Sequence, residues 1–251
     1  MKVGIALSGG AVRGAAHIGV LKALEEKGIK PQFISGSSAG SIVGAFYAAG
    51  YPPEEMEKIA LGTKFLSYMK PELSFSALFS LEKLEIFLTK YIGKKDISEL
   101  EKKLFVCVTN LNRGIPEYKS KGDLFLWISA SSSLPFIFKP VEYEGSLYID
   151  GGIMDNLPVE PLKIHSDYII GVDVNPLGTE ERLNNAFSIL IRSFYLAFRS
   201  NVELRKKSCD LFIQPEDLVD IGLFSAWRVK DAIEIGYRYT KMMLDRNNLK
   251  M

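Results

Sequence analysis

The chain has 251 residues, of which 47% are hydrophobic and 24% are charged, and its formal net charge at pH 7 is +1. A balance this even provides no dominant basic face, so we expect no nucleic-acid partner. The longest uninterrupted apolar stretch, residues 42–51, contains two glycines and is shorter than the ~20 residues that span a bilayer. We therefore expect a soluble chain, with residues 1–251 forming a single domain, and peripheral contact with a membrane stays open.

Apolar runs of strand length alternate with helical patterns along the chain. The first half predicts a strand at 3–7, a helix over 15–27 that ends at Gly28, a strand at 33–34, a helix over 39–49 that ends at Gly50 and a strand over 104–109. The second half predicts a strand within 141–149, a strand over 168–174, a long amphipathic helix over 183–207, a strand at 211–213 and a terminal helix over 229–244. This alternation predicts an α/β fold with a mainly parallel sheet.

Gly36-Ser37-Ser38-Ala39-Gly40 form a GxSxG motif between a predicted strand and a predicted helix. A nucleophile elbow requires this context, with its serine on a sharp strand-to-helix turn. Gly36 and Gly40 leave room where a Cβ would clash, and the helix N-terminus adds partial positive charge. Ser38 is therefore the candidate nucleophile, since Ser37 does not fit the frame of the motif.

A second glycine-rich turn, at residues 8–14, also lies between a strand and a helix, where backbone N–H groups can point at an anion. A dinucleotide-binding turn would need an acidic residue at the end of the second strand, but that strand leads into the GxSxG motif. We therefore expect an oxyanion-hole loop that contains Gly9 and uses the backbone amides of Gly10 and Ala11. Arg13 belongs to the same loop, where it supports the negative charge, meets a phosphate head group or forms a structural ion pair.

Asp150-Gly151-Gly152 directly follow the predicted strand that ends at residue 149. A carboxylate at the carboxyl end of a sheet strand lies where α/β proteins place their active sites. Asp150 is therefore the candidate base, although the same three residue types also form ordinary turns.

A serine nucleophile usually passes its proton to a histidine, and the chain has two histidines. His17 lies near the buried stripe of the first helix, which favours a structural role. His165 gives the Ser–Asp–His order of α/β-hydrolases, but it precedes its strand and so belongs at the wrong end of a parallel sheet. We favour a Ser38–Asp150 dyad, in which burial raises the pKa of Asp150 above the ordinary value of about 3.9.

Two cysteines, Cys107 and Cys209, lie in apolar contexts without CxxC spacing. This is typical of small core residues in a reducing compartment, so we expect a cytoplasmic protein. The apolar run at 3–7 is interrupted by Gly9 and Gly10 before a signal peptide is complete.

The three motifs, in this order, resemble the patatin-like phospholipase family, and the resemblance covers most of the chain. Residues 17–21, 130–135, 138–141 and 155–158 are also similar to family sequences. One departure is Ala11, where glycine is common in the family, although alanine still donates an N–H if its backbone angles permit.

The resemblance implies a three-layer α/β/α sandwich and a Ser–Asp dyad, with Gly151 and Gly152 completing the base motif, that works without a metal; we expect no cofactor. It also implies hydrolysis of fatty-acyl esters in phospholipids, lysophospholipids or neutral lipids. Acyl length, head group and oligomeric state are not predicted, because a fold does not fix its substrate.

Two other functions stay open at this point. One is an α/β-hydrolase-type esterase or thioesterase that uses Ser38 with His165, and the other is a lipid-binding or regulatory protein without catalysis. Residues 63–79 also have two interpretations, because they carry many apolar side chains around Pro71. Packing on the core is favoured over a mobile apolar cover above an acyl-chain pocket.

Overall fold

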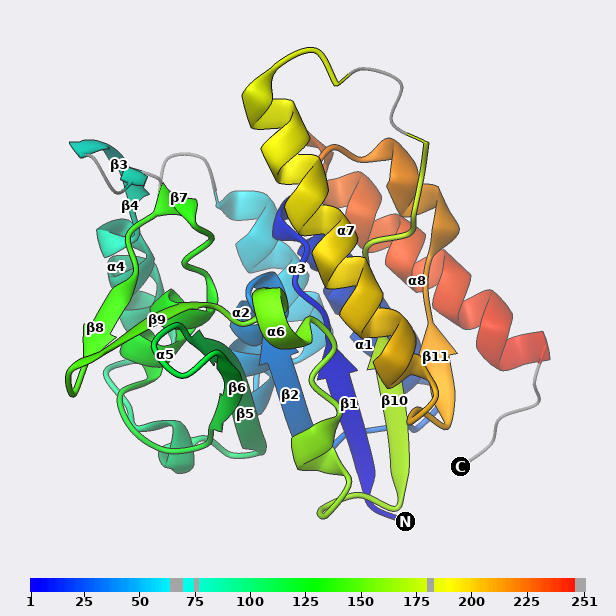
Figure 1. The fold of residues 1–251 in the computed structure, drawn as a ribbon. Coiled ribbons are helices and arrows are strands. Elements are labelled where there is room, and N and C mark those ends of the chain that lie inside the picture. Colours follow the sequence, from blue (N-terminus) through cyan, green and yellow to red (C-terminus); the bar gives the residue numbers. More distant parts are fainter. Residues whose placement is uncertain (64–69, 75–76, 180–182, 247–251) are drawn as a thin grey trace.

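The computed structural model describes residues 1–63, 70–74, 77–179 and 183–246 (Figure 1). The hypothesis of an apolar cover at 63–79 therefore falls in part outside the described residues, at 64–69 and 75–76. In the described ranges, no helix has both the length and the apolar character needed to cross a bilayer.

Eight of the described strands form the central sheet, in the order β11-β10-β1-β2-β5-β9-β8, with β6 paired to β5. Their bounds are β1 Val3–Leu7, β2 Phe33–Ser37, β5 Lys103–Asn110, β6 Ile115–Lys119, β8 Val141–Tyr143, β9 Ser146–Asp150, β10 Tyr168–Val172 and β11 Leu211–Ile213. The strands from β11 to β5 run parallel, whereas β6, β8 and β9 pair antiparallel. The mainly parallel sheet predicted from the sequence is confirmed.

Helices cover both faces of this sheet, as the burial of every residue of β1 requires, because successive side chains of a strand point to opposite faces. Ile5 and Leu7 pack into one apolar cluster, and Ala6 between them packs into the other. The first cluster includes α1 (Ala16–Glu26), α2 (Ala39–Ala48) and α8 (Val229–Arg246), and the second includes α7 (Ala186–Lys206). Figure 1 shows α7 and the short α6 (Gly152–Asp155) on the opposite side of the sheet from α1 and α8. The arrangement is the predicted three-layer α/β/α sandwich.

Every element predicted from the sequence is present, with bounds that differ by a few residues. The helix expected from residue 15 begins at Ala16 and follows a 3₁₀-helix, η1 (Ala11–Ala15). Elements absent from the prediction are β6, α6, α3 (Pro53–Gly62), α4 (Glu82–Tyr91), α5 (Leu124–Ser131) and a small sheet of β3 (Lys70–Ser74), β4 (Ala77–Ser80) and β7 (Phe136–Phe138).

One edge of β5 is shared by two strands, and this decides where the site forms. β2 pairs with residues 103–107 of β5, and β9 pairs with residues 108–110. Because β6 pairs with residues 106–110 and a strand has two hydrogen-bonding edges, β9 must lie on the same edge as β2. The carboxyl ends of β2 and β9 therefore meet head to head, with Ser37 opposite Cys107 and Asp150 opposite Val108.

Helices α1 and α8 touch backbone to backbone through two glycines. A Cβ on Gly19 would lie 2.0 Å from the carbonyl oxygen of Ile233, and one on Gly236 would lie 2.2 Å from the carbonyl oxygen of Ala16. This contact holds α1, and with it the glycine-rich turn that precedes it, against the terminal helix.

We expect Gly236→Ala to lower the free energy of unfolding by about 1–3 kcal/mol, because overpacking outweighs the ~1 kcal/mol that alanine gains in a helix. Gly62→Ala is the matched control, since a Cβ there meets nothing within 4 Å, and it should be neutral or slightly stabilising. Urea denaturation measures both effects. Equal stability of the two variants would contradict the close contact between α1 and α8.

Candidate active site

Ser38 lies on the turn between β2 and α2 with φ 49° and ψ −123°, a conformation that non-glycine residues rarely adopt. A Cβ on Gly36 would lie 2.4 Å from the carbonyl oxygen of Gly40, and one on Gly40 would lie 2.3 Å from that of Leu7. The start of α2 thus presses directly on β1 and β2. This is the strained turn that a nucleophile elbow needs, and it requires glycine at both flanking positions.

Residues 131–133, at the carboxyl end of α5, connect the elbow to the Asp150 turn. The hydroxyl of Ser131 accepts a hydrogen bond from the Ser38 N–H at 2.8 Å. The backbone N–H of Asp150 donates to the carbonyl of Ser133 at 3.0 Å, and that of Gly151 donates to the carbonyl of Ser131 at 3.4 Å. The same short segment therefore fixes both turns.

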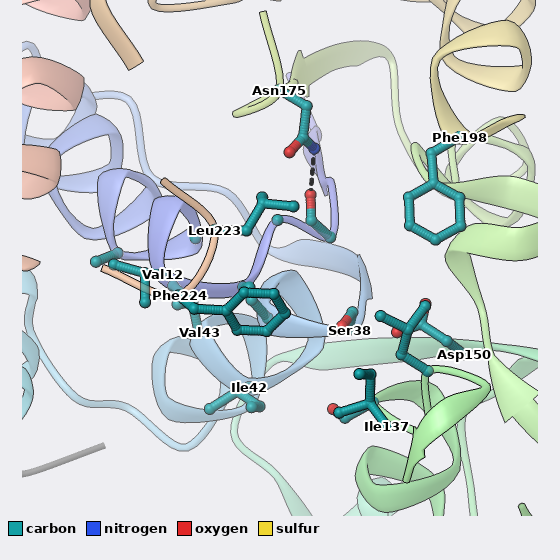
Figure 2. A pocket seen from close by; sticks show the side chains of 18 of the residues that line it. Val12, Ser38, Ile42, Val43, Ile137, Asp150, Asn175, Phe198, Leu223 and Phe224 are labelled. Carbon is teal, nitrogen blue, oxygen red and sulfur yellow. Dashed lines mark hydrogen bonds between the residues drawn. The ribbon is translucent and has the colours of Figure 1, made fainter. Parts of the chain in front are cut away.

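Asp150 is only 3% exposed, and its carboxylate accepts a hydrogen bond at 2.8 Å from the backbone N–H of Gly152. Burial raises the pKa of Asp150 from 3.8 to about 7, although the Gly152 N–H and the neighbouring Ser38 side chain act in the opposite direction. Figure 2 shows Ser38 and Asp150 together at the wall of a pocket. Gly151 is required for close approach, since a Cβ there would lie 2.2 Å from the carbonyl oxygen of Cys107.

Asp150 is the last residue of β9, at the carboxyl end of a strand as the sequence predicted. The direction of that strand was not predicted, and β9 runs antiparallel to β5. Asp150 reaches Ser38 because β9 stops where β2 also stops, on the shared edge of β5.

The glycine-rich turn leaves two backbone amides free. In the described part of the chain, the N–H groups of Gly10 and Ala11 have no hydrogen-bond acceptor, and both residues line the same cavity as Ser38. The other amides of the turn are occupied: the Gly9 N–H donates to Asn156 Oδ1 at 3.0 Å, and the Val12 N–H donates to the carbonyl of Leu223 at 3.1 Å. Ala11 has φ 47°, so alanine adopts the left-handed conformation that suits glycine at this position.

Arg13 has a structural environment, one of the roles that the sequence left open, although its partners are carbonyl groups and a ring instead of an acidic side chain. The side chain is buried, and Nε donates to the carbonyl of Ile221 at 2.6 Å, while a second nitrogen donates to the carbonyl of Val219 at 3.3 Å. The guanidinium also lies over the ring of Tyr195, 5.8 Å from its centroid. Arg13 therefore ties the turn to residues 219–221 and is absent from the cavity lining, so it does not belong to the oxyanion-binding group.

Neither histidine is placed to act on Ser38. The Nε2 of buried His17 lies 2.8 Å from the carbonyl of Ser8, and burial lowers the pKa of His17 to about 4 despite this contact. His165 stacks between Phe33 and Phe105, with ring centroids 5.4 and 5.3 Å away. Phe33 begins β2, and the strand from there to Ser38 is about 16 Å long at ~3.3 Å per residue. His165 thus lies near the amino-terminal end of β2, at the opposite end of the parallel strands from Ser38.

The cavity beside Ser38 has a volume of about 260 Å³. Apolar side chains from both helical layers and from the loops form most of its lining: Val12, Ile18, Ile42, Val43, Leu84, Ile137, Phe194, Phe198, Leu223 and Phe224. Ser38 and Asp150 lie beside each other at its wall (Figure 2), and Gly10 and Ala11 belong to the same lining. This arrangement suits a long apolar ligand with one reactive polar group. The described side chains include no cluster of His, Cys, Asp or Glu that could hold a metal ion.

Two asparagines of the site gave no signal as functional residues in the sequence. Asn156 receives the Gly9 N–H, and Asn175 donates through Nδ2 to the carbonyl of Gly9 at 2.5 Å. Both line the cavity. Asn156 lies in the stretch 155–158 that is similar to family sequences. Its hydrogen bond to Gly9, however, forms only because the fold brings the turn after β9 next to the turn after β1.

Comparisons with known proteins agree with this geometry. Lysophospholipase nte1 of Aspergillus fumigatus is 29% identical over 279 aligned positions, which cover 97% of this chain and 18% of that protein. Lysophospholipase NTE1 of Coccidioides immitis is 30% identical over 280 positions, with the same coverage of 97% and 18%. The chain thus spans less than a fifth of the length of these relatives.

The crystal structure of VipD from Legionella pneumophila has the same fold, with a TM-score of 0.58 and 17% identity over 98% of this chain and 67% of that one. The sequence pattern of the family described as Patatin-like phospholipase matches residues 5–163. This match includes Ser38, Asp150 and the glycine-rich turn. Because it extends over more than half of the chain, the protein belongs to the patatin-like phospholipase family.

Proposed function

We propose that this protein is a serine lipid acyl hydrolase that cleaves the fatty-acyl esters of phospholipids or lysophospholipids. The observation that carries the proposal is the placement of Ser38 beside the buried carboxylate of Asp150 in the lining of an apolar cavity. The similar fungal proteins are named lysophospholipases, and this supports a substrate with a single acyl chain.

In the first half of the reaction, the acyl chain occupies the apolar cavity and its carbonyl carbon faces Ser38. Asp150 accepts the hydroxyl proton as the Ser38 oxygen attacks. The carbonyl oxygen gains negative charge and accepts hydrogen bonds from the amides of Gly10 and Ala11. The C–O bond to the alcohol then breaks, Asp150 returns its proton to the leaving oxygen, and an acyl-Ser38 ester remains.

In the second half, water replaces the alcohol beside Asp150. The carboxylate accepts a proton from this water, whose oxygen attacks the acyl carbon with the same two amides in place. The fatty acid leaves as the proton passes from Asp150 to the Ser38 oxygen. A carboxylate with an ordinary pKa would be a poor base here, but a pKa of about 7 gives Asp150 the proton affinity that histidine usually supplies.

The alternative that uses Ser38 with His165 loses its support, because the stacked ring of His165 lies at the opposite end of the parallel strands from Ser38. A lipid-binding protein without catalysis would have no need for the backbone conformation of Ser38, which costs about 1–3 kcal/mol. We therefore favour an enzyme.

The rim of the cavity supports peripheral contact with a lipid surface. Trp227 is 78% exposed and follows the lining residue Ala226. Phe136 is 62% exposed and precedes the lining residue Ile137, and Phe224 is 41% exposed while it lines the cavity itself. Exposed aromatic side chains favour the interface between water and lipid. We propose that this rim meets the membrane and that the substrate enters the cavity from there.

Ser38→Ala and Asp150→Asn should each lower the hydrolysis of p-nitrophenyl esters at least 10³-fold, because one removes the attacking oxygen and the other removes the base. Turnover by the wild-type protein should improve from butyryl to long-chain esters, since longer chains fill more of the cavity.

The control for this pair is Ser37→Ala, a neighbouring serine outside the cavity lining, which should keep most of the activity. Circular dichroism checks that each variant is folded. A fully active Asp150→Asn would rule out the dyad, and a wild-type protein without turnover on any ester or on lysophosphatidylcholine would favour a binding role.

The reaction rate should rise with pH up to about 7 and then level off, because only ionised Asp150 accepts the proton. Stability should change in the opposite direction. The pKa of Asp150 is higher in the folded than in the unfolded state, so its ionisation destabilises the fold as pH rises from about 4 to about 7. The melting temperature of Asp150→Asn should therefore exceed that of the wild type by more at pH 8 than at pH 4, and a constant difference would argue against the raised pKa.

Vesicles of phosphatidylcholine should shift the tryptophan fluorescence to shorter wavelength. The chain has two tryptophans, and Trp127 is buried, so the shift reports on Trp227. Trp227→Ala should lower co-sedimentation with vesicles several-fold. Ile164→Ala is the matched control, because Ile164 is 83% exposed but adjoins His165, at the opposite end of the parallel strands from the cavity. Equal binding by both variants would show that the rim is not the contact.

A further inference from the structure

The peptide group between Gly9 and Gly10 is held by side chains from two other parts of the chain. The Gly9 carbonyl accepts a hydrogen bond from Asn175 Nδ2 at 2.5 Å (Figure 2), and the Gly9 N–H donates to Asn156 Oδ1 at 3.0 Å. Both asparagines are buried. A glycine-rich backbone that would otherwise turn freely is therefore fixed on either side of Gly9.

The contact with the Gly9 carbonyl also decides where the next amide points. In a planar trans peptide, the carbonyl of one residue and the N–H of the next point in opposite directions. Because the Gly9 carbonyl is directed at Asn175, the Gly10 N–H is directed away from it. Gly10 lines the cavity with Ser38, and its N–H has no acceptor among the described residues.

Asn175 is itself firmly placed, and its orientation is unambiguous. Its backbone N–H donates to Asp173 Oδ1 at 3.1 Å, and Nδ2 lies 3.4 Å from the same oxygen. Since the Gly9 carbonyl and the Asp173 carboxylate are both acceptors, only the NH₂ end of the Asn175 amide can face them. Asp173 is fully buried, and Oδ2 accepts from Gln214 at 2.7 Å and from Arg199 at 3.3 Å.

The sheet brings these two segments together. β1 and β10 are parallel neighbours with Leu7 opposite Val172, so residues 8–10 and 173–175 leave the sheet side by side. A Cβ on Gly10 would lie 2.5 Å from Val174 Cγ2 and 3.2 Å from Asn175 Oδ1. The two segments are thus packed so tightly that only glycine fits at position 10.

We propose that Asn175 is a positioning residue of the oxyanion hole: by holding the Gly9 carbonyl, it keeps the Gly10 amide directed at the oxygen that becomes negatively charged. This role rests on the proposed function. Without the side chain, the Gly9–Gly10 peptide can rotate and withdraw the donor. Loss of one oxyanion donor costs about 10²–10³ in kcat, so loss of its positioning should cost about 10–100-fold.

The test compares Asn175→Ala and Asn175→Leu with the wild-type protein on the best p-nitrophenyl ester. Both variants should lower kcat about 10–100-fold and change KM less than about threefold. A long-chain alkyl trifluoromethyl ketone, which forms a hemiketal oxyanion with Ser38, should lose affinity by the same factor. The methyl ketone of equal length, which binds without forming the oxyanion, should bind unchanged.

Asn110→Ala is the matched control for the loss of a buried asparagine. Asn110 donates to Glu117 at 2.9 Å and accepts from the Arg113 N–H at 3.1 Å, and it is outside the cavity lining. This variant should lose stability but keep the wild-type kcat and the wild-type preference between the two ketones.

Folded Asn175 variants that keep the wild-type kcat, or that lose equal affinity for both ketones, would overturn the positioning role. The proposed function would still stand if turnover by the wild-type protein depends on Ser38. A wild-type protein without such turnover would overturn both. If neither variant folds, the test is the NMR chemical shift of the Gly10 amide in the wild-type protein. It should move downfield with the trifluoromethyl ketone only, and a signal that does not respond would overturn the proposal.

Discussion

The site depends on one constraint of the sheet, the sharing of a single edge of β5 by β2 and β9. Both strands end on this edge from opposite directions, so their next residues, Ser38 and the Asp150 turn, meet. The hydrogen-bond register of β5 thereby sets the distance between the two side chains, and residues 131–133 at the end of α5 hold the two turns together. A shift of one residue in either pairing would turn the side chains to the other face of the sheet and separate them.

Burial makes the carboxylate useful and also makes it costly. The same desolvation that raises the pKa of Asp150 to about 7 means that its ionisation opposes folding near neutral pH. The backbone conformations of Ser38 and Ala11, both with positive φ, store further strain at the same place. Apolar clusters on both faces of the sheet and the tight contact of α1 with α8 provide the stability that offsets these costs.

Buried polar side chains outside the three motifs give the glycine-rich turn its shape. Arg13 fixes the segment at 219–221, which leads to the cavity wall at Leu223 and Phe224, while Asn156 and Asn175 hold Gly9 from two sides. A motif rich in glycine has little conformational preference of its own. Its two free amides therefore keep their direction only because side chains from elsewhere in the fold occupy the other groups of the turn.

The α/β alternation and the three motifs could be predicted from the sequence alone, because strand and helix periodicity and the glycines of a strand-to-helix turn are local properties of the chain. The sequence did not reveal α5, whose residues are apolar nearly throughout and show no helical period. The direction of β9, the stacking of His165 and the partners of Arg13 and Asn175 were decided by the tertiary structure alone. Each of them depends on which distant segments the sheet places next to one another, and that pairing is set by burial and register over the whole fold.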